Sequence, residues 1–109
     1  MIEVQLNGHR CNAYSNDSIT TMSAGIPVHF TFSGGWSDLE KTVVFRVGTS
    51  QVDVPLNGDT IMLPTDILLH PGQLTVGVYG RNATGDKCIA STITTVGRIQ
   101  PGTGDMFHA

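Results

Sequence analysis

Alternating apolar and polar positions dominate the chain and predict short β-strands. The clearest alternation covers residues 26–32, where every second residue is apolar. Successive side chains of a strand point to opposite faces, so such a segment would bury one face and expose the other. The apolar members of this and the similar segments, which with Trp36 we expect to form the core, are Ile26, Val28, Phe30, Phe32, Val43, Phe45, Val47, Val52, Val54, Leu56, Leu74, Val76 and Val78.

Turn signals separate these segments. Asn7-Gly8 and Asn57-Gly58 are residue pairs that favour two-residue hairpins, so each predicts a hairpin between the strands that flank it. Gly48 to Ser50 predicts a further turn. The polar stretch 15–25 indicates a connection, and Pro64 suits the first position of a single helical turn that ends before the His70-Pro71-Gly72 stop.

The end of the chain continues the pattern. Residues 73–79 predict a strand, and residues 88–95 predict a Thr-rich strand that 96–99 extends. Counted along the chain, this gives about seven to nine short strands with frequent turns and no long amphipathic helix. We therefore expect one all-β domain at residues 1–102, an antiparallel β-sandwich, followed by a C-terminal tail at 103–109 in which Met106 and Phe107 could dock.

Composition excludes several classes of function. Six basic against nine acidic residues, a net charge of −3, argue against nucleic-acid binding, which needs a basic surface. The chain has neither the roughly 20 consecutive apolar residues of a membrane helix nor an N-terminal signal peptide, so we expect cytoplasmic synthesis and no membrane insertion. Only 14% of residues are charged, against about 25% in typical domains. Either the surface is a neutral, Thr- and Ser-rich β surface, or neighbouring subunits cover part of it.

No candidate site for a metal, a cofactor or catalysis emerges. The four histidines, which lie in separate segments, are His9, His29, His70 and His108. His9 and Cys11 are too few for zinc, which takes four ligands. Asp38, Glu40, Asp53 and Asp59 fall in or beside turns and fit solvated carboxylates. We find no set of nucleophile, base and orienting residue, and no phosphate-binding loop, so we expect no enzyme activity and no cofactor.

Two cysteines, Cys11 and Cys88, allow one disulfide, but without a secretion signal two buried, reduced thiols are the expected state. Glycines also stand out on the strand that contains Leu74. Gly77 and Gly80 predict that another group approaches closely, and the flat ring of Trp36 is a candidate. Tyr79, between these glycines, should face outward or lie at the sheet edge with its hydroxyl in water.

The C-terminal half carries a recognisable pattern. Residues 70–80, HPGQLTVGVYG, resemble the entry to the penultimate strand of fibronectin type III and related immunoglobulin-like sandwiches. In those domains an aromatic residue two positions after Pro-Gly makes the tyrosine corner. Leu74 occupies that place here, so the hydroxyl-to-backbone bond of that corner cannot form.

A wider match covers about residues 26–102. Its motif residues are Trp36, Leu39, Lys41, Phe45, Leu63, Pro64, Ile67, Leu68, Pro71, Gly72, Leu74, Val76, Gly77, Val78, Tyr79, Gly80, Ile93, Thr94, Thr95, Gly97, Ile99, Pro101 and Gly102. In this order the motifs resemble the immunoglobulin-like N-terminal domain of phage baseplate upper proteins and of related tail and prophage structural proteins of Gram-positive bacteria.

The resemblance implies a non-enzymatic structural adaptor in a virion tail or baseplate. Its partners would be other tail or baseplate proteins, or further copies of itself. No coiled-coil stalk follows in the 109 residues, so we expect the adaptor domain alone or a short relative. The candidate contact residues are Trp36, Asp38, Tyr79, Arg81 and Asn82.

A second hypothesis is a carbohydrate-binding module that recognises a host-wall glycan. In that case Trp36 and Tyr79 would be exposed and would stack on sugar rings. A small hydrolase is a third alternative, which the missing catalytic set disfavours.

Overall fold

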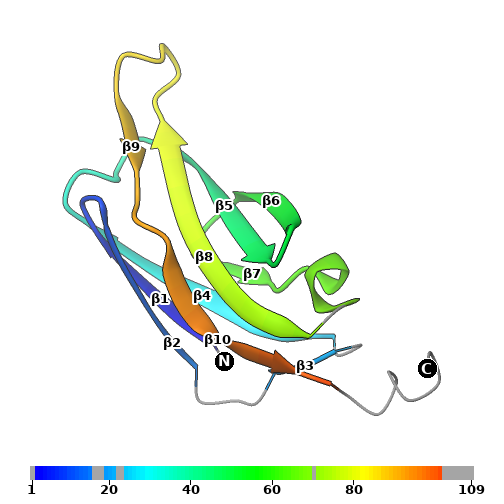
Figure 1. Ribbon diagram of the computed structural model, residues 1–109. Coiled ribbons are helices and arrows are strands. Elements are labelled where there is room, and N and C mark those ends of the chain that lie inside the picture. The colour runs from blue at the N-terminus through cyan, green and yellow to red at the C-terminus, as the bar shows by residue number, and fades with distance from the viewer. Residues whose placement is uncertain (1, 16–18, 22–23, 70, 102–109) are drawn as a thin grey trace.

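Two β-sheets face each other in the computed structural model, which describes residues 2–15, 19–21, 24–69 and 71–101 (Figure 1). The expected tail at 103–109 lies outside the described residues. In chain order the elements are β1 (Ile2–Asn7), β2 (Arg10–Ser15), β3 (Ile19–Thr20), β4 (Pro27–Ser33), β5 (Glu40–Val47), β6 (Ser50–Leu56), β7 (Thr60–Met62), the 3-10 helix η1 (Thr65–Leu69), β8 (Gly72–Arg81), β9 (Cys88–Ala90) and β10 (Thr94–Gln100).

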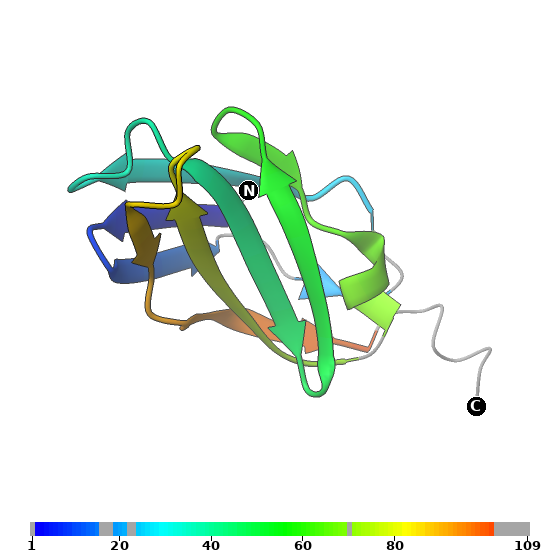
Figure 2. The ribbon, with the colours of Figure 1, turned by 90° about the horizontal axis from the view of Figure 1, so that it is seen from above.

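The order of the strands is that of an immunoglobulin-type sandwich. Sheet A has the order β2-β1-β4-β7, and sheet B has the order β3-β10-β8-β5-β6, with β9 paired to β8. From β4 onward the chain places β4 and β7 in one sheet and β6-β5-β8-β10 in the other, which is the Greek-key order of that fold class. Seen from above, the two layers are separate (Figure 2). The expected all-β sandwich is thus confirmed.

Two strand pairs are parallel, so the sheets are mixed rather than purely antiparallel. β1 runs parallel to β4, and β3 runs parallel to β10. The parallel pairs arise from the segment 15–25, which was expected to be only a connection but contains β3. Because β3 belongs to sheet B, the chain leaves sheet A after β2 and returns as β4 beside β1, in the same direction.

The predicted hairpins have different outcomes. Asn7 pairs with Arg10, so the first hairpin is confirmed, but its loop is Gly8-His9, one residue later than expected. Gly8 has φ 60°, which suits the first position of a type II′ turn. The hairpin predicted at Asn57-Gly58 is wrong. Strand β6 before it pairs with β5 in sheet B, whereas β7 after it pairs with β4 in sheet A, so this segment crosses between the sheets.

The predicted continuous strand over 88–99 is also wrong, because the chain leaves β8 after Ser91, whose amide still donates to the Val78 carbonyl at 2.8 Å. The Ser91 hydroxyl accepts a hydrogen bond from the Val78 amide at 2.8 Å, so a side chain replaces a backbone partner. The next amide, that of Thr92, donates to the carbonyl of His9 at 2.7 Å and thereby ties this segment to the β1–β2 turn. β10 then rejoins β8, with a register shift between Thr95 and Gly97.

The core lies between the sheets and contains the residues that the alternation marked. Nine of those expected core residues are buried, namely Val28, Phe30, Val43, Phe45, Val47, Leu56, Leu74, Val76 and Val78, and the other four, Ile26, Phe32, Val52 and Val54, pack against them. Helix η1 confirms the expected helical turn and adds Ile67 and Leu68 to the core. Each such side chain contributes about 1.5–3 kcal/mol by burial. In the described part of the chain, no helix is long and apolar enough to cross a membrane.

Candidate functional site

Four of the five predicted contact residues gather at one end of sheet B, where β5 begins and β8 ends. Tyr79 pairs with Thr42 of β5, and Arg81 pairs with Glu40. Asp38 lies two residues before Glu40, and Asn82 follows Arg81 directly. This is the end from which the β8–β9 hairpin projects (Figure 1).

Trp36 belongs to the core instead, with 1% of its surface exposed. Its indole nitrogen donates a hydrogen bond to the carbonyl of Gly8 at 2.6 Å, and its ring lies 5.3 Å from that of Phe32. A Cβ atom on Gly80 would lie 3.2 Å from the indole ring, so the expected packing of Trp36 on a glycine is confirmed at Gly80. The expectation of an exposed Trp36 that stacks on sugars is wrong, because the ring fills the core and its N–H is bonded to the β1–β2 turn.

Two further predicted contact residues have local structural roles. The side-chain oxygen of Asn82 accepts a hydrogen bond from the amide of Lys87 at 3.1 Å, and the Asn82 carbonyl accepts one from Gly85 at 3.1 Å. Asn82 therefore closes the loop between β8 and β9. Asp38 has φ 68° in the turn where the Leu39 amide donates to Trp36, a conformation that aspartate tolerates. Their role as partner contacts stays a prediction.

The remaining aromatic candidate, Tyr79, faces outward as expected and borders an apolar groove on the outer face of sheet B. The groove has a volume of about 250 Å³. Its floor includes Gly77, and Tyr79, Ile93 and Val44 contribute apolar surface to its walls. Ile93 is 61% exposed and Tyr79 is 37% exposed. A Cβ on Gly77 would lie 3.5 Å from the side chain of Ile93. The absence of a side chain at Gly77 therefore lets Ile93 lie close to the backbone of β8.

The sequence pattern did not indicate that Ile93 lies at the surface. Alternation predicted a regular strand over 88–95, in which Ile93 would share a face with Ile89 and Ser91. The strand ends before Ser91, so this arrangement does not form. The hydroxyl of Ser91 bonds to β8, and the alternation of apolar and polar residues does not reveal such a contact.

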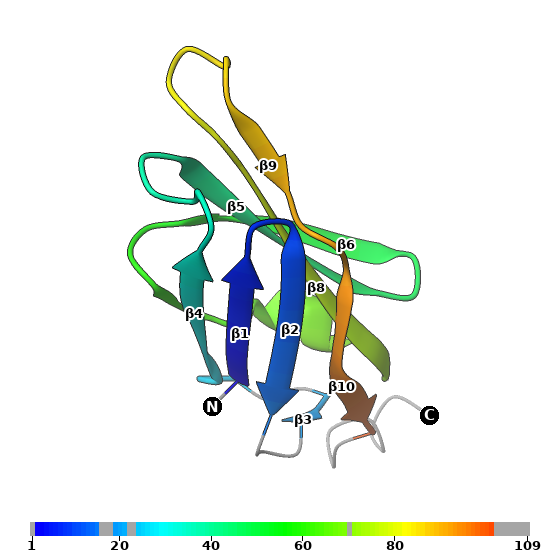
Figure 3. The same cartoon turned by 90° about the vertical axis from the view of Figure 1, so that its left-hand side faces the viewer.

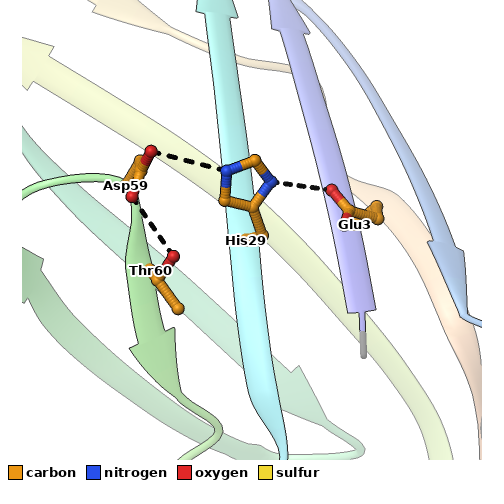
Figure 4. Close-up of polar contacts among 4 residues, drawn as sticks. All are labelled: Glu3, His29, Asp59 and Thr60. Atoms are coloured by element: carbon orange, nitrogen blue, oxygen red, sulfur yellow. Dashed lines mark hydrogen bonds and ion pairs between the residues drawn. The ribbon is translucent and has the colours of Figure 1, made fainter.

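A second polar arrangement surrounds His29 on the outer face of sheet A (Figure 4). The imidazole Nδ1 lies 2.8 Å from Glu3 Oε2, and Nε2 lies 3.4 Å from Asp59 Oδ2. The hydrogen bond to Glu3 raises the pKa of His29, and the charges of Glu3 and Asp59 add to this effect, while desolvation opposes it. The outward orientation of His29 was expected. Its partners were not, because they depend on the parallel register that sets Glu3 beside His29.

This cluster is not arranged as a hydrolytic triad. The hydroxyl of Thr60 donates to Asp59 at 3.2 Å, not to the imidazole, and both imidazole nitrogens already face carboxylates. A nucleophile in such a triad must hydrogen-bond to the histidine that accepts its proton. The cluster therefore connects β1, β4 and the segment just before β7 through the imidazole of His29.

The raised pKa of His29 predicts a specific pH dependence of stability. A group whose pKa is raised in the folded state adds stability that is complete below its unfolded pKa, near 6.5, and is lost as pH rises through the folded pKa. We expect wild type to be more stable than His29→Gln at pH 5.5, with the difference shrinking by pH 8.5. Thermal unfolding at both values measures it. A difference that grows with pH would contradict this assignment.

The thiols differ in exposure, so the expectation of two buried thiols holds for Cys11 alone. Both cysteines are free, Cys11 is buried and Cys88 is exposed. Burial raises the pKa of the Cys11 thiol, against the opposing effect of a hydrogen bond with Ser91. The thiolate is the reactive form.

We expect a thiol reagent to modify one equivalent of thiol rapidly in the native protein and the second equivalent only after denaturation. Cys88→Ser should remove the fast phase, and a fast phase that survives this substitution would contradict the assignment.

Within the described ranges, no three His, Cys, Asp or Glu side chains are grouped as metal ligands would be, and His70 and His108 lie outside those ranges.

Comparison with models of protein families, with curated proteins and with solved structures yields no match to this chain.

Proposed function

We propose that this chain is a non-enzymatic docking domain, a structural adaptor of a phage or prophage tail or baseplate. In this proposal the groove bordered by Tyr79 and Ile93 binds another tail protein or a second copy of the chain. The motif resemblance over residues 26–102 supports the kind of assembly. The exposed apolar groove is the observation on which the docking role rests.

The chemistry of the groove suits a protein partner. Cores of protein interfaces are rich in aromatic residues and poor in charged ones. Tyr79 and Ile93 provide exposed apolar surface, and Arg46 is the one charged residue that lines the groove. Arg46 donates to Gln51 at 2.6 Å, and a polar pair beside an apolar centre is typical of an interface rim.

The alternative of a carbohydrate-binding module is weaker in the form that the sequence suggested. That form required two exposed aromatic side chains, and only Tyr79 is exposed, because Trp36 lies in the core. Tyr79 alone does not provide the paired stacking surface.

A double substitution, Tyr79→Ser with Ile93→Ser, tests the proposal. We expect wild type to self-associate in sedimentation experiments or to retain a purified tail protein in a pull-down, and the variant to lose about tenfold or more in affinity, a typical effect at an interface centre. Tyr14→Ser, on the outer face of sheet A, is the matched control and should bind as wild type does. A strictly monomeric wild type at high concentration that retains no virion protein would refute the proposal.

A further inference from the structure

The outer face of sheet A contains a polar hollow, on the opposite side of the sandwich from the Tyr79–Ile93 groove. Figure 3 shows the strands that form it, β4, β1 and β2, side by side. The hollow has a volume of about 430 Å³. Its polar lining consists of Gln5, Asn7, Arg10, Asn12, Thr31 and Ser33.

Strand register arranges these side chains in rows. β1 lies in the middle, so Gln5 is flanked by Asn12 on β2 and Thr31 on β4. The next row places Arg10 beside Asn7. Because side chains two residues apart on one strand share a face, the rows form one continuous surface. A regular sheet thus holds amide and hydroxyl groups at fixed spacings.

Most of these groups are available to a ligand. The side chains of Gln5, Asn12 and Thr31 form no hydrogen bond with any other residue that the structure describes. Amide side chains both donate and accept hydrogen bonds, and a hydroxyl does the same. Neighbouring hydroxyl groups of a sugar also donate and accept, so the two surfaces are chemically complementary.

Charge narrows the class of ligand further. Arg10 is the charged member of the lining and has no carboxylate partner among the described residues, and no acidic side chain lines the hollow. A guanidinium group binds a carboxylate or a phosphate through two parallel hydrogen bonds. This end of the hollow therefore suits an anionic group.

An aromatic ring extends the same surface in the other direction. Tyr14 follows Asn12 by two residues on β2, so it lies on the same face, and it is 55% exposed. From Arg10 to Tyr14 the strand covers about 13 Å, at 3.3 Å per residue. The β1 residue opposite Tyr14 is Glu3, whose carboxylate bonds to His29, so the ring lies at the acidic end of this face and Arg10 at the other. The surface thus combines a cation, amides and an exposed amphipathic ring along one line.

We propose that this face binds an acidic saccharide, a hydroxyl-rich chain that carries carboxylate or phosphate groups. Gln5 and Asn12 would hydrogen-bond to hydroxyl groups, Arg10 would bind the anionic group, and Tyr14 would cover a sugar ring. This site is separate from the proposed docking groove and does not depend on it.

Titrations followed by NMR amide shifts test the proposal with four probes: trigalacturonate, a maltotriose that carries a phosphate group, neutral maltotriose and a triglutamate peptide. We expect saturable shifts in β1, β2 and β4 with at least one of the two anionic carbohydrate probes, and the responding probe identifies carboxylate or phosphate. Maltotriose and triglutamate should bind more weakly by about tenfold. Triglutamate binding as tight as that of the better carbohydrate probe would show a site for acidic peptides and overturn the proposal.

Surface variants locate the site. Gln5→Ala and Asn12→Ala should each weaken binding about tenfold, and Arg10→Gln should remove the preference for the anionic probe over maltotriose. Arg98→Gln, which removes an exposed arginine on β10 of sheet B, is the matched control and should bind as wild type does. Tyr79→Ser with Ile93→Ser should also leave this binding intact, which separates the site from the docking groove. Thermal melting verifies that each variant is folded.

The proposal is overturned if neither anionic carbohydrate probe gives saturable shifts, or if the shifts centre on Tyr79 and Ile93. It is equally overturned if Arg10→Gln binds both probe classes as wild type does, because the anionic specificity rests on that side chain.

Discussion

Trp36→Ala is expected to lower the free energy of unfolding by about 3–5 kcal/mol, the usual cost of truncating a large buried aromatic side chain. The indole is fully buried and packs against Phe32 and Gly80. Its N–H also holds the β1–β2 turn through the Gly8 carbonyl, so one side chain connects the end of sheet A with the start of β5. The substitution therefore removes contacts between the two layers. Urea unfolding followed by circular dichroism measures the change.

A matched variant separates packing from hydrogen bonding at this position. Trp36→Phe keeps an aromatic ring but loses the donor to Gly8, and we expect a smaller loss, of about 1–3 kcal/mol. If Trp36→Ala were no more destabilising than Trp36→Phe, the indole would not be the link between the layers that its contacts indicate.

Gly34→Ala should have the second large effect, about 3 kcal/mol in total. Gly34 has φ 77°, a conformation that costs other residues about 1–2 kcal/mol. In addition, a Cβ at this position would lie 2.6 Å from the backbone nitrogen of Gly8. Overlap with backbone cannot be relieved by a rotamer change, so we add a cost within the 1–3 kcal/mol typical of overpacking.

Gly85→Ala is the control for Gly34→Ala. Gly85 has nearly the same φ, 78°, but a Cβ there meets nothing within 4 Å. Only the conformational cost remains, so we expect a loss of about 1–2 kcal/mol. Equal destabilisation by the two substitutions would show that the close approach of Gly34 to the β1–β2 turn carries no cost. Urea unfolding of both variants, compared with wild type, decides this.

The candidate contact surface was only partly predictable. Tyr79 was expected outside because it alternates with Val78 on a strongly periodic strand, and it lies there. Trp36 was expected in the core and also chosen as a contact residue; it lies in the core, where its N–H bonds to the Gly8 carbonyl, 28 positions away in the chain. Ile93 was missed because β9 ends at Ala90, and the Val78 amide then bonds to the Ser91 hydroxyl instead of a backbone carbonyl. The positions of Trp36 and Ile93 both depend on contacts between distant segments, which the periodicity of the sequence does not reveal.

The polar groups of sheet A show the same limit. His29 was expected to face solvent, which alternation alone decides. Its position between Glu3 and Asp59 required the parallel pairing of β1 with β4 and the crossing of residues 57–59 into sheet A. The same parallel pairing places Thr31 beside Gln5, while the β1–β2 hairpin places Asn12 on its other side.

The sequence by itself determined that the protein is built of strands and which face of the periodic strands turns inward, because a period of two places their apolar residues on one face, and burial removes that face from water. It also determined the β1–β2 hairpin and the η1 turn, which are local. Only the tertiary structure decided which strands are neighbours, where the chain crosses between sheets, and which polar side chains share a face. These features come from pairings between segments far apart in the chain, and such pairings are chosen by the packing of the whole core.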